Sequence, residues 1–228
     1  MSSTDFSMMT ETDVANIVLQ RSDIVSAGPQ IRAWMKGDSA PLLALAAEKR
    51  GFLLSAGLEA AEKACATFTD ATDALAPGRV ADIGCGYAFA DLFLYRRYGC
   101  DLVLIDIEEG NDRHFGFNAA HPGYTSLERA RAFLVANGVP ADKITTVNPN
   151  QTEVSGLGAF DLVISLLSCG FHYPVETYAA LFAEQVSQGG GIVIDIRKGS
   201  GGMAELKKFG AVSVLQSQQK HSRVMVRV

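Results

Sequence analysis

Residues 80–90 read Val80-Ala81-Asp82-Ile83-Gly84-Cys85-Gly86-Tyr87-Ala88-Phe89-Ala90. An apolar run ends in an acidic residue, two glycines one residue apart follow it, and an apolar helical pattern then begins. This order predicts a buried strand, a tight turn and the start of a helix. Because glycine tolerates positive φ and lets a ligand approach bare backbone, we expect the turn to hold a nucleotide-like molecule.

The bulk composition is that of an ordinary globular chain. Hydrophobic residues make up 48% and charged residues 20% of 228 residues, enough for one domain with a sizeable core. The net charge of -5 disfavours a nucleic acid partner, which a basic surface would attract. The sequence contains no apolar run long enough to cross a membrane and no signal-peptide pattern at its start, so we expect a cytoplasmic protein.

The cysteines form no CxxC pair and have no histidine at zinc-finger spacing, so we predict no metal site. In a reducing compartment we expect them to be free thiols in or near the core. They are Cys65, Cys85, Cys100 and Cys169.

The chain divides near residue 76. Residues 1–10 are polar and expected to be frayed, and the rest of residues 1–76 has a helical pattern without a strand signal, which predicts an N-terminal helical cap. We expect Gly28-Pro29 to end its first helix and Pro41 to begin a longer one.

Residues 77–228 alternate between strand and helix patterns, which predicts a parallel sheet between helical layers. Only Ser217–Ser222 separates the last two strands, too short a stretch for a crossover helix, so they must pair antiparallel. The predicted fold class is α/β, a doubly wound, seven-stranded, mostly parallel sheet with a terminal antiparallel hairpin. The predicted strands cover 79–83, 102–106, 144–147, 160–166, 191–196, 211–216 and 223–228, and the predicted helices 89–98, 126–137, 175–185 and 203–209.

This layout resembles the class I S-adenosylmethionine-dependent methyltransferases over roughly residues 77–228. The run from Asp82 to Ala88 is similar to that family's first motif, with Ala88 in place of the third glycine. About 20 residues further on, Asp106 ends the second predicted strand, where the family carries an acidic residue. The runs 160–165 and 189–194 are similar to its fourth and fifth strands.

The resemblance implies S-adenosylmethionine as the cofactor, with the Asp106 carboxylate accepting the ribose hydroxyls. It implies that Asn148 lies near the adenine, although Asn-Pro is equally typical of a plain turn. The cofactor-binding residues implied in this way are Asp82, Gly84, Cys85, Gly86, Asp106, Ile107, Asn148 and Ser165.

A loop after the fourth predicted strand carries the candidate catalytic residues, His172 and Tyr173. In the family this loop contacts the substrate and lies under the transferable methyl group. A histidine has a pKa suited to taking the proton from an acceptor hydroxyl. The alternative is that both residues pack against and cap the next helix.

Other polar residues receive weaker predictions. The long connection over 107–125, with His114 and His121, is interpreted either as a flap over the substrate or as a surface excursion. Glu108 is expected to be solvated and His221 to lie at the surface. Arg197 and Lys198 are interpreted as a solvated loop, with contact to a substrate acid as the alternative.

The predicted function is methyl transfer to a small polar molecule, with a hydroxyl as the preferred acceptor, and the helical cap is a candidate homodimer interface. The first alternative is an NAD-dependent oxidoreductase. Phe89 stands against it, because the dinucleotide fingerprint needs a glycine at that position. The second is a non-catalytic binding subunit of the same fold, which would have no use for the motif residues.

Overall fold

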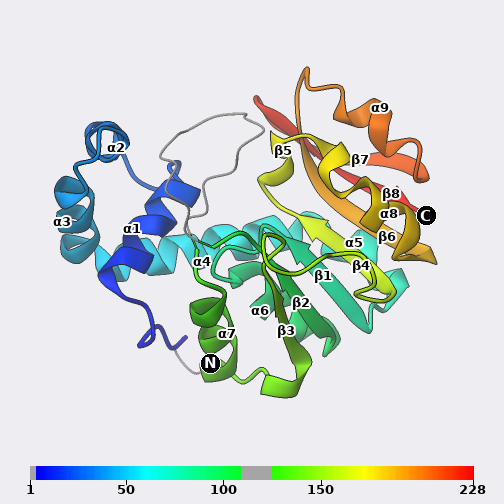
Figure 1. The fold of residues 1–228 in the computed structure, drawn as a ribbon, viewed down its shortest axis with the longest axis horizontal. Helices are drawn as coiled ribbons and strands as arrows, with labels where there is room; N and C mark the ends of the chain where they lie inside the picture. Colours follow the sequence, from blue (N-terminus) through cyan, green and yellow to red (C-terminus); the bar gives the residue numbers. More distant parts are fainter. Residues whose placement is uncertain (1–3, 109–124) are drawn as a thin grey trace.

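The computed structural model describes residues 4–108 and 125–228, which form a seven-stranded sheet in the order β3-β2-β1-β4-β6-β8-β7 (Figure 1). Strands β1, β2, β3, β4 and β6 run parallel, and β8 pairs antiparallel with both β6 and β7. The predicted α/β sheet with its terminal hairpin is therefore confirmed. Its strands are β1 Arg79–Ile83, β2 Asp101–Ile105, β3 Ile144–Val147, β4 Phe160–Ser165, β6 Val186–Arg197, β7 Ala211–Ser217 and β8 His221–Arg227.

Residues before the sheet are helical, as predicted, and Figure 1 shows α1 to α3 on the opposite side of the molecule from the terminal hairpin. Pro29 lies in the first turn of α2, where its missing N–H is tolerated. The expectation that Gly28-Pro29 ends a helix is therefore wrong, because these residues begin one. The elements are α1 Glu11–Gln20, α2 Gly28–Met35, α3 Ala40–Glu48, α4 Arg50–Ala66, α5 Thr69–Thr72 and the 3-10 turn η1 Asp73–Leu75.

Helices between the strands cover both faces of the sheet. The helix after β1 has the predicted bounds, whereas the predicted helix over 175–185 divides into a 3-10 turn and a short α-helix. These elements are α6 Phe89–Tyr98, α7 Leu127–Ala136, η2 Ala141–Lys143, η3 Val175–Tyr178, α8 Ala179–Glu184 and α9 Gly202–Leu206.

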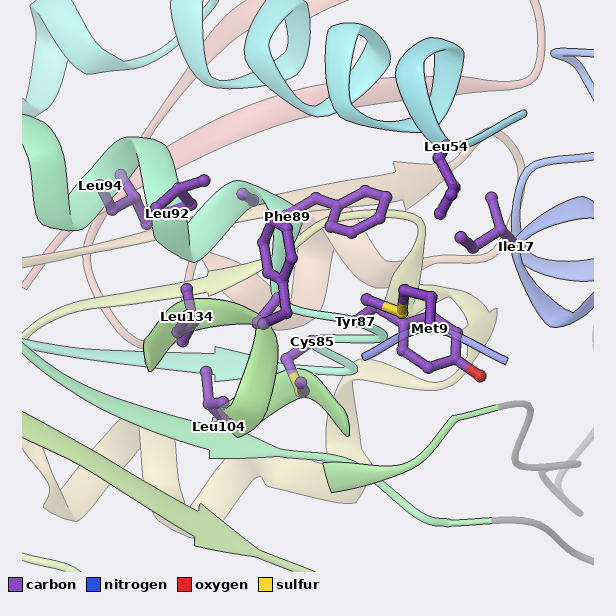
Figure 2. Packing of buried hydrophobic residues seen from close by; sticks show 14 of the residues in the cluster. Met9, Ile17, Leu54, Cys85, Tyr87, Phe89, Leu92, Leu94, Leu104 and Leu134 are labelled. Carbon is purple, nitrogen blue, oxygen red and sulfur yellow. The ribbon is translucent and has the colours of Figure 1, made fainter. Parts of the chain in front are cut away.

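Two hydrophobic clusters lie on the two faces of the sheet, and successive residues of β1 alternate between them: Val80 belongs to one and Ala81 to the other. The first cluster joins the cap to the sheet. Figure 2 shows Leu54 of α4, Leu92 of α6 and Leu134 of α7 in this cluster. The cap helices therefore share their core with one face of the sheet.

The residues before α1 are packed rather than frayed. The Phe6 ring stacks on Phe133 at a centroid distance of 5.7 Å and meets the edge of Phe89 at 5.9 Å. Arg50 of α4 donates hydrogen bonds to the carbonyls of Phe6 and Met9, at 3.3 and 2.6 Å. The expectation of a frayed start is wrong for residues 4–10. Although most of these residues are polar, Phe6 and Met9 pack into the core and hold the segment in place.

The described residues bear on the predictions for the cysteines, for membrane-spanning helices, for metal sites and for the flap. All four cysteines are buried and free, as expected. No helix in residues 4–108 and 125–228 is long and apolar enough to cross a membrane, and no group of His, Cys, Asp or Glu in those ranges could hold a metal ion. Most of the predicted flap, including His114 and His121, lies outside the described residues.

Candidate active site

The turn after β1 has the backbone geometry that its glycines predict. Gly84, Gly86 and Ala88 have φ values of 77°, 57° and 59°, in the left-handed region that favours glycine. Ala88 keeps this conformation although it stands where the family has a glycine, and it caps α6. The Gly84 N–H donates to the Ile105 carbonyl at 2.7 Å, so the turn is anchored to the end of β2.

Asp106 lies directly beside this turn. Its Oδ2 accepts a hydrogen bond from the Gly86 N–H at 2.8 Å, and the Gly86 carbonyl accepts one from Thr125 Oγ1 at 2.6 Å. Burial raises the pKa of Asp106 to about 7, against the hydrogen bonds from Gly86 and Ile107, and Glu108 raises it further. The carboxyl that the resemblance assigns to the ribose is thus held at the turn. With a pKa of about 7, it is partly protonated and partly ionised near neutral pH.

A pair of buried carboxyls lies behind the first motif: Asp82, whose contact with the cofactor stays a prediction, and Asp91, which was not predicted. Asp82 on β1 and Asp91 in the first turn of α6 are both buried, and Asp82 Oδ1 and both Asp91 oxygens lack a hydrogen-bond donor. Burial raises the pKa of Asp82 well above its usual value, and the charges of Asp91 and Asp106 add to this. Burial also raises the pKa of Asp91. Two carboxyls in this position are stable when they share a proton.

Glu108 joins three elements at the end of β2. One of its carboxylate oxygens accepts from the Leu127 N–H at the start of α7, at 3.1 Å, and the other accepts from Asn148 Nδ2 at 3.4 Å. The expectation of a solvated Glu108 is therefore wrong, because it caps a helix. Asn148 Oδ1 accepts from the Asn150 N–H at 3.0 Å, which is the turn chemistry weighed as the alternative, and its contact with adenine stays a prediction.

The segment predicted as a catalytic loop is a strand, β5 Ser168–Tyr173, that lies against the carboxyl end of β6. Leu167 turns the chain into it with φ 53°, a costly conformation for leucine. The Leu167 N–H donates to Asp195 Oδ2 at 3.1 Å, which holds the residue in place. The prediction of a loop is wrong because the chain turns from β4 into β5 through a single left-handed residue, Leu167. No glycine, proline or asparagine marks this turn in the sequence.

Strand β5 brings a serine against the glycine turn. A Cβ at Gly84 would collide with the Ser168 side chain, and Ser168 Oγ lies 3.0 Å from the Tyr173 hydroxyl. Burial raises the pKa of Tyr173 well above 10, so its hydroxyl stays protonated and can donate but cannot act as a base near neutral pH. Ser168 was not among the predicted site residues, because a serine three residues past β4 carries no sequence signal of its own.

Two further predicted cofactor residues, Ser165 and Cys85, lie at or next to the glycine turn. Ser165 Oγ donates to the Ile83 carbonyl at 2.8 Å and accepts from the Cys169 N–H at 2.9 Å, so it links β1 to β5. Burial raises the pKa of the Cys85 thiol, with Asp106 and other carboxylates adding to the shift, and the thiol is therefore inert. Direct contacts of Ser165, Cys85 and Ile107 with a cofactor stay predictions.

His172 lies in an aromatic and basic cluster at the far end of β5. Its ring meets the edge of Phe171 at 4.9 Å, and Arg197 lies over the Phe171 ring at 4.5 Å while its Nε donates to the Phe171 carbonyl at 2.7 Å. His221 packs against Phe171 from the other side, at 5.4 Å. The structure thus brings His172 together with Arg197, which lies at the end of β6 rather than in a solvated loop.

The expectation that His221 lies at the surface is wrong, since only 7% of it is exposed. Strand β8 begins two residues earlier than predicted, and His221 pairs with Arg197 across the sheet. Burial lowers the pKa of His221, as do the charges of Arg223, Lys198 and Arg21, while Asp195 opposes the shift. Asp195 itself is held by Arg223 in two hydrogen bonds of 2.9 and 2.8 Å.

The sequence matches no protein-family model, and no curated protein matches it. Among solved structures, it is similar to a candidate O-methyltransferase from Nostoc punctiforme, with a TM-score of 0.55, 13% identity and coverage of 95% of this chain and 72% of that one. It is also similar to the methyltransferase domain of bacterial CtHen1, with a TM-score of 0.53, 13% identity and coverage of 72% and 96%. Together with the order and direction of the strands, these similarities show that the chain has the class I S-adenosylmethionine-dependent methyltransferase fold.

Proposed function

We propose that this protein is an S-adenosylmethionine-dependent methyltransferase that acts on a hydroxyl group of a small polar molecule. The observation that carries the proposal is the pairing of the left-handed glycine turn with Asp106, whose carboxylate accepts the Gly86 N–H at 2.8 Å. A carboxylate at the carboxyl end of the neighbouring strand is positioned to accept two vicinal hydroxyls of a ribose.

The residues at this edge fit the cofactor. Asp106 would hold the ribose and Asn148 would lie near the adenine, while the missing Cβ atoms of Gly84 and Gly86 let the side chains of Ser168 and Gln20 approach the turn. When bound, S-adenosylmethionine supplies a methyl carbon on a positively charged sulfonium. The carboxyls of Asp82, Asp91 and Asp106 suit a cationic ligand, because each gains from a nearby positive charge.

His172 is the residue proposed to take the proton from the acceptor hydroxyl. It is half-buried on β5, the strand whose first residue lies against the glycine turn. Tyr173 is proposed to donate from its protonated hydroxyl together with Ser168, which fixes the position of the acceptor. Alignment of the acceptor oxygen and removal of its proton are what methyl transfer requires of the protein.

The NAD-dependent alternative is less well supported. The glycine turn of a dinucleotide site offers backbone N–H groups to the pyrophosphate, but the N–H groups of Gly84, Cys85, Gly86 and Ala88 in this turn donate to acceptors within the protein. Phe89, at the position of the last fingerprint glycine, fills the core beside Phe133 with a centroid distance of 4.9 Å.

Calorimetric titration of the full chain with S-adenosylhomocysteine and, separately, with NADH tests the proposal. We expect S-adenosylhomocysteine to bind with a Kd in the micromolar range, about −8 kcal/mol, and NADH to give no heat. Binding of NADH without binding of S-adenosylhomocysteine would overturn the proposed function. Asp106→Asn is the matched variant, since it keeps the shape of the side chain and removes its charge.

A further inference from the structure

The side chain of Gln20, the last residue of α1, lies against the second glycine of the turn. A Cβ built at Gly86 would lie 2.8 Å from Gln20 Oε1 and 3.6 Å from Gln20 Nε2. Gln20 is half-buried and distant in sequence from every motif residue. The space above the Gly86 backbone, over which the proposed function places the cofactor, is therefore bordered by a carboxamide from the helical cap.

The turn itself has few groups left with which to bind that end of the cofactor. The N–H groups of Gly84 and Cys85 donate to the Ile105 carbonyl, and the Gly86 N–H donates to Asp106. The Gly86 carbonyl already accepts from Thr125. Since these backbone groups are engaged within the protein, a carboxylate and an ammonium above the turn need partners from side chains.

Helix α1 is fixed to the turn through Tyr87, which is only 2% exposed. The Tyr87 hydroxyl donates to Asp13 Oδ1 at 2.9 Å and accepts from Asn16 Nδ2 at 3.2 Å. Figure 2 shows Tyr87 near Ile17 of α1. Asp13, Asn16 and Gln20 follow the spacing i, i+3, i+7, so they lie along one face of the helix.

Asp13 is itself held firmly, because its Oδ2 accepts from the N–H and hydroxyl of Thr10, each at 2.7 Å. Arg129 Nε of α7 lies 3.8 Å from the same oxygen. The face of α1 that carries Gln20 is thus anchored at its start by a capping box and at its middle by Tyr87.

We propose that the helical cap completes the cofactor site: Tyr87 holds α1 on the glycine turn, and the Gln20 carboxamide binds the amino acid end of S-adenosylmethionine. This inference rests on the proposed function. A carboxamide matches that end of the ligand, because its oxygen accepts from an ammonium and its NH₂ donates to a carboxylate. Gln20 is a binding residue in this assignment, and Tyr87 is a positioning residue.

Calorimetry with two ligands separates this role from a general structural one. S-adenosylhomocysteine carries the amino acid end, whereas 5′-methylthioadenosine keeps the adenosine and the thioether but lacks that end. We expect Gln20→Ala to bind S-adenosylhomocysteine about tenfold more weakly, the loss of one or two hydrogen bonds, and to bind 5′-methylthioadenosine with unchanged affinity. Gln218→Ala, at an exposed glutamine of the terminal hairpin, is the control and should leave both affinities unchanged.

Tyr87→Phe tests the positioning role, since it removes the hydroxyl and keeps the ring. We expect weaker binding of S-adenosylhomocysteine and faster amide hydrogen exchange in α1, with exchange in β4 unchanged. Unchanged binding of S-adenosylhomocysteine by Gln20→Ala, or an equal loss for both ligands, would overturn the inference and leave the proposed function standing. Failure of the wild-type protein to bind S-adenosylhomocysteine would instead overturn the proposed function.

Discussion

The two halves of the carboxyl edge of the sheet have opposite electrostatic character. Around β1 and β2 the groups are the buried carboxyls of Asp82 and Asp91 and the half-buried carboxyl of Asp106, and desolvation raises their pKa values. Around β5, β6 and β8 the groups are Arg197, His221 and the Arg223–Asp195 ion pair, and burial together with neighbouring cations lowers the pKa of His221 although Asp195 opposes the shift. One half suits a cationic cofactor, and the other half suits an electron-rich acceptor.

The two halves also differ in how they are built. The acidic half comes mainly from one continuous motif and the end of the next strand, whereas the basic half is assembled from segments distant in sequence. Residues 171, 197 and 221 meet there through strand pairing and ring contacts. A short motif can therefore identify the cofactor side of such a site, but the acceptor side depends on the tertiary structure.

The largest expected effect is that of Gly84→Ala, which acts where the two halves meet. The new Cβ would collide with Ser168 on β5, and the residue would keep a left-handed φ of 77°, so we expect loss of S-adenosylhomocysteine binding and destabilisation by at least about 2 kcal/mol. Chemical unfolding and calorimetry measure both. Gly51→Ala, in α4 with no atom near the added Cβ, is the control and should be neutral or slightly stabilising; equal behaviour of the two variants would contradict this account.

His172→Gln addresses the acceptor half alone. We expect the methyl-transfer rate at saturating substrate to fall by about 100-fold or more, the usual contribution of a general base, with an unchanged affinity for S-adenosylhomocysteine. The transfer of a labelled methyl group measures the rate, and calorimetry measures the affinity for S-adenosylhomocysteine. A turnover equal to that of the wild type would remove His172 from the mechanism.

Asp106→Asn addresses the cofactor half. The pKa of about 7 means that roughly a tenth of this carboxyl is ionised at pH 6 and nine tenths at pH 8. If the ionised form accepts both ribose hydroxyls, as proposed, the affinity of the wild type for S-adenosylhomocysteine should rise up to about tenfold over this range. We expect the variant to bind more weakly and to lose most of this pH dependence, although the nearby carboxyls Asp82 and Asp91 also have raised pKa values. A pH profile identical to that of the wild type would show that Asp106 is not the responsible group.

The smallest effect is expected for Asp91→Asn. Because the pKa of Asp91 is raised in the folded protein, the folded state holds a proton that the unfolded chain releases, and the free energy of unfolding falls as pH rises from the usual carboxyl pKa towards 7. The amide of the variant stays neutral and can donate to Asp82. We expect its unfolding midpoint to exceed that of the wild type by about 3 °C at pH 8 and by less at pH 5.

Asp142→Asn changes an exposed aspartate in η2 and is the control, with no expected shift at either pH. A lower midpoint for Asp91→Asn at pH 8 would mean that the Asp82–Asp91 pair stabilises the fold in its charged form.

The sequence predicted the sheet well because its signals are local. Strand β1 is a mainly apolar run, β3 is a short run of β-branched residues, and α6 follows directly from the turn, so their bounds agree with the structure. The position of Asp106 beside the turn could be predicted because its distance from the turn is set by one helix and one strand; its contact with a ribose stays a prediction.

Gln20, Asp91, Ser168 and His221 could not be found in this way. Gln20 reaches the turn only because α1 folds back onto Tyr87, and Ser168 does so only because Leu167 adopts a left-handed conformation. Asp91 looks like an ordinary acidic residue in a first helical turn, and His221 like a residue of a hairpin turn. Their burial depends on how the cap, β5 and β8 pack.

A crystal structure of the full chain with S-adenosylhomocysteine tests most directly whether the acidic half of the carboxyl edge of the sheet binds the cofactor and the basic half binds the acceptor. We predict that both ribose hydroxyls lie within hydrogen-bond distance of the Asp106 carboxylate and that the sulfur faces Ser168 and His172. A ligand seated instead among Phe171, Arg197 and His221, with Asp106 making no contact to it, would contradict the account.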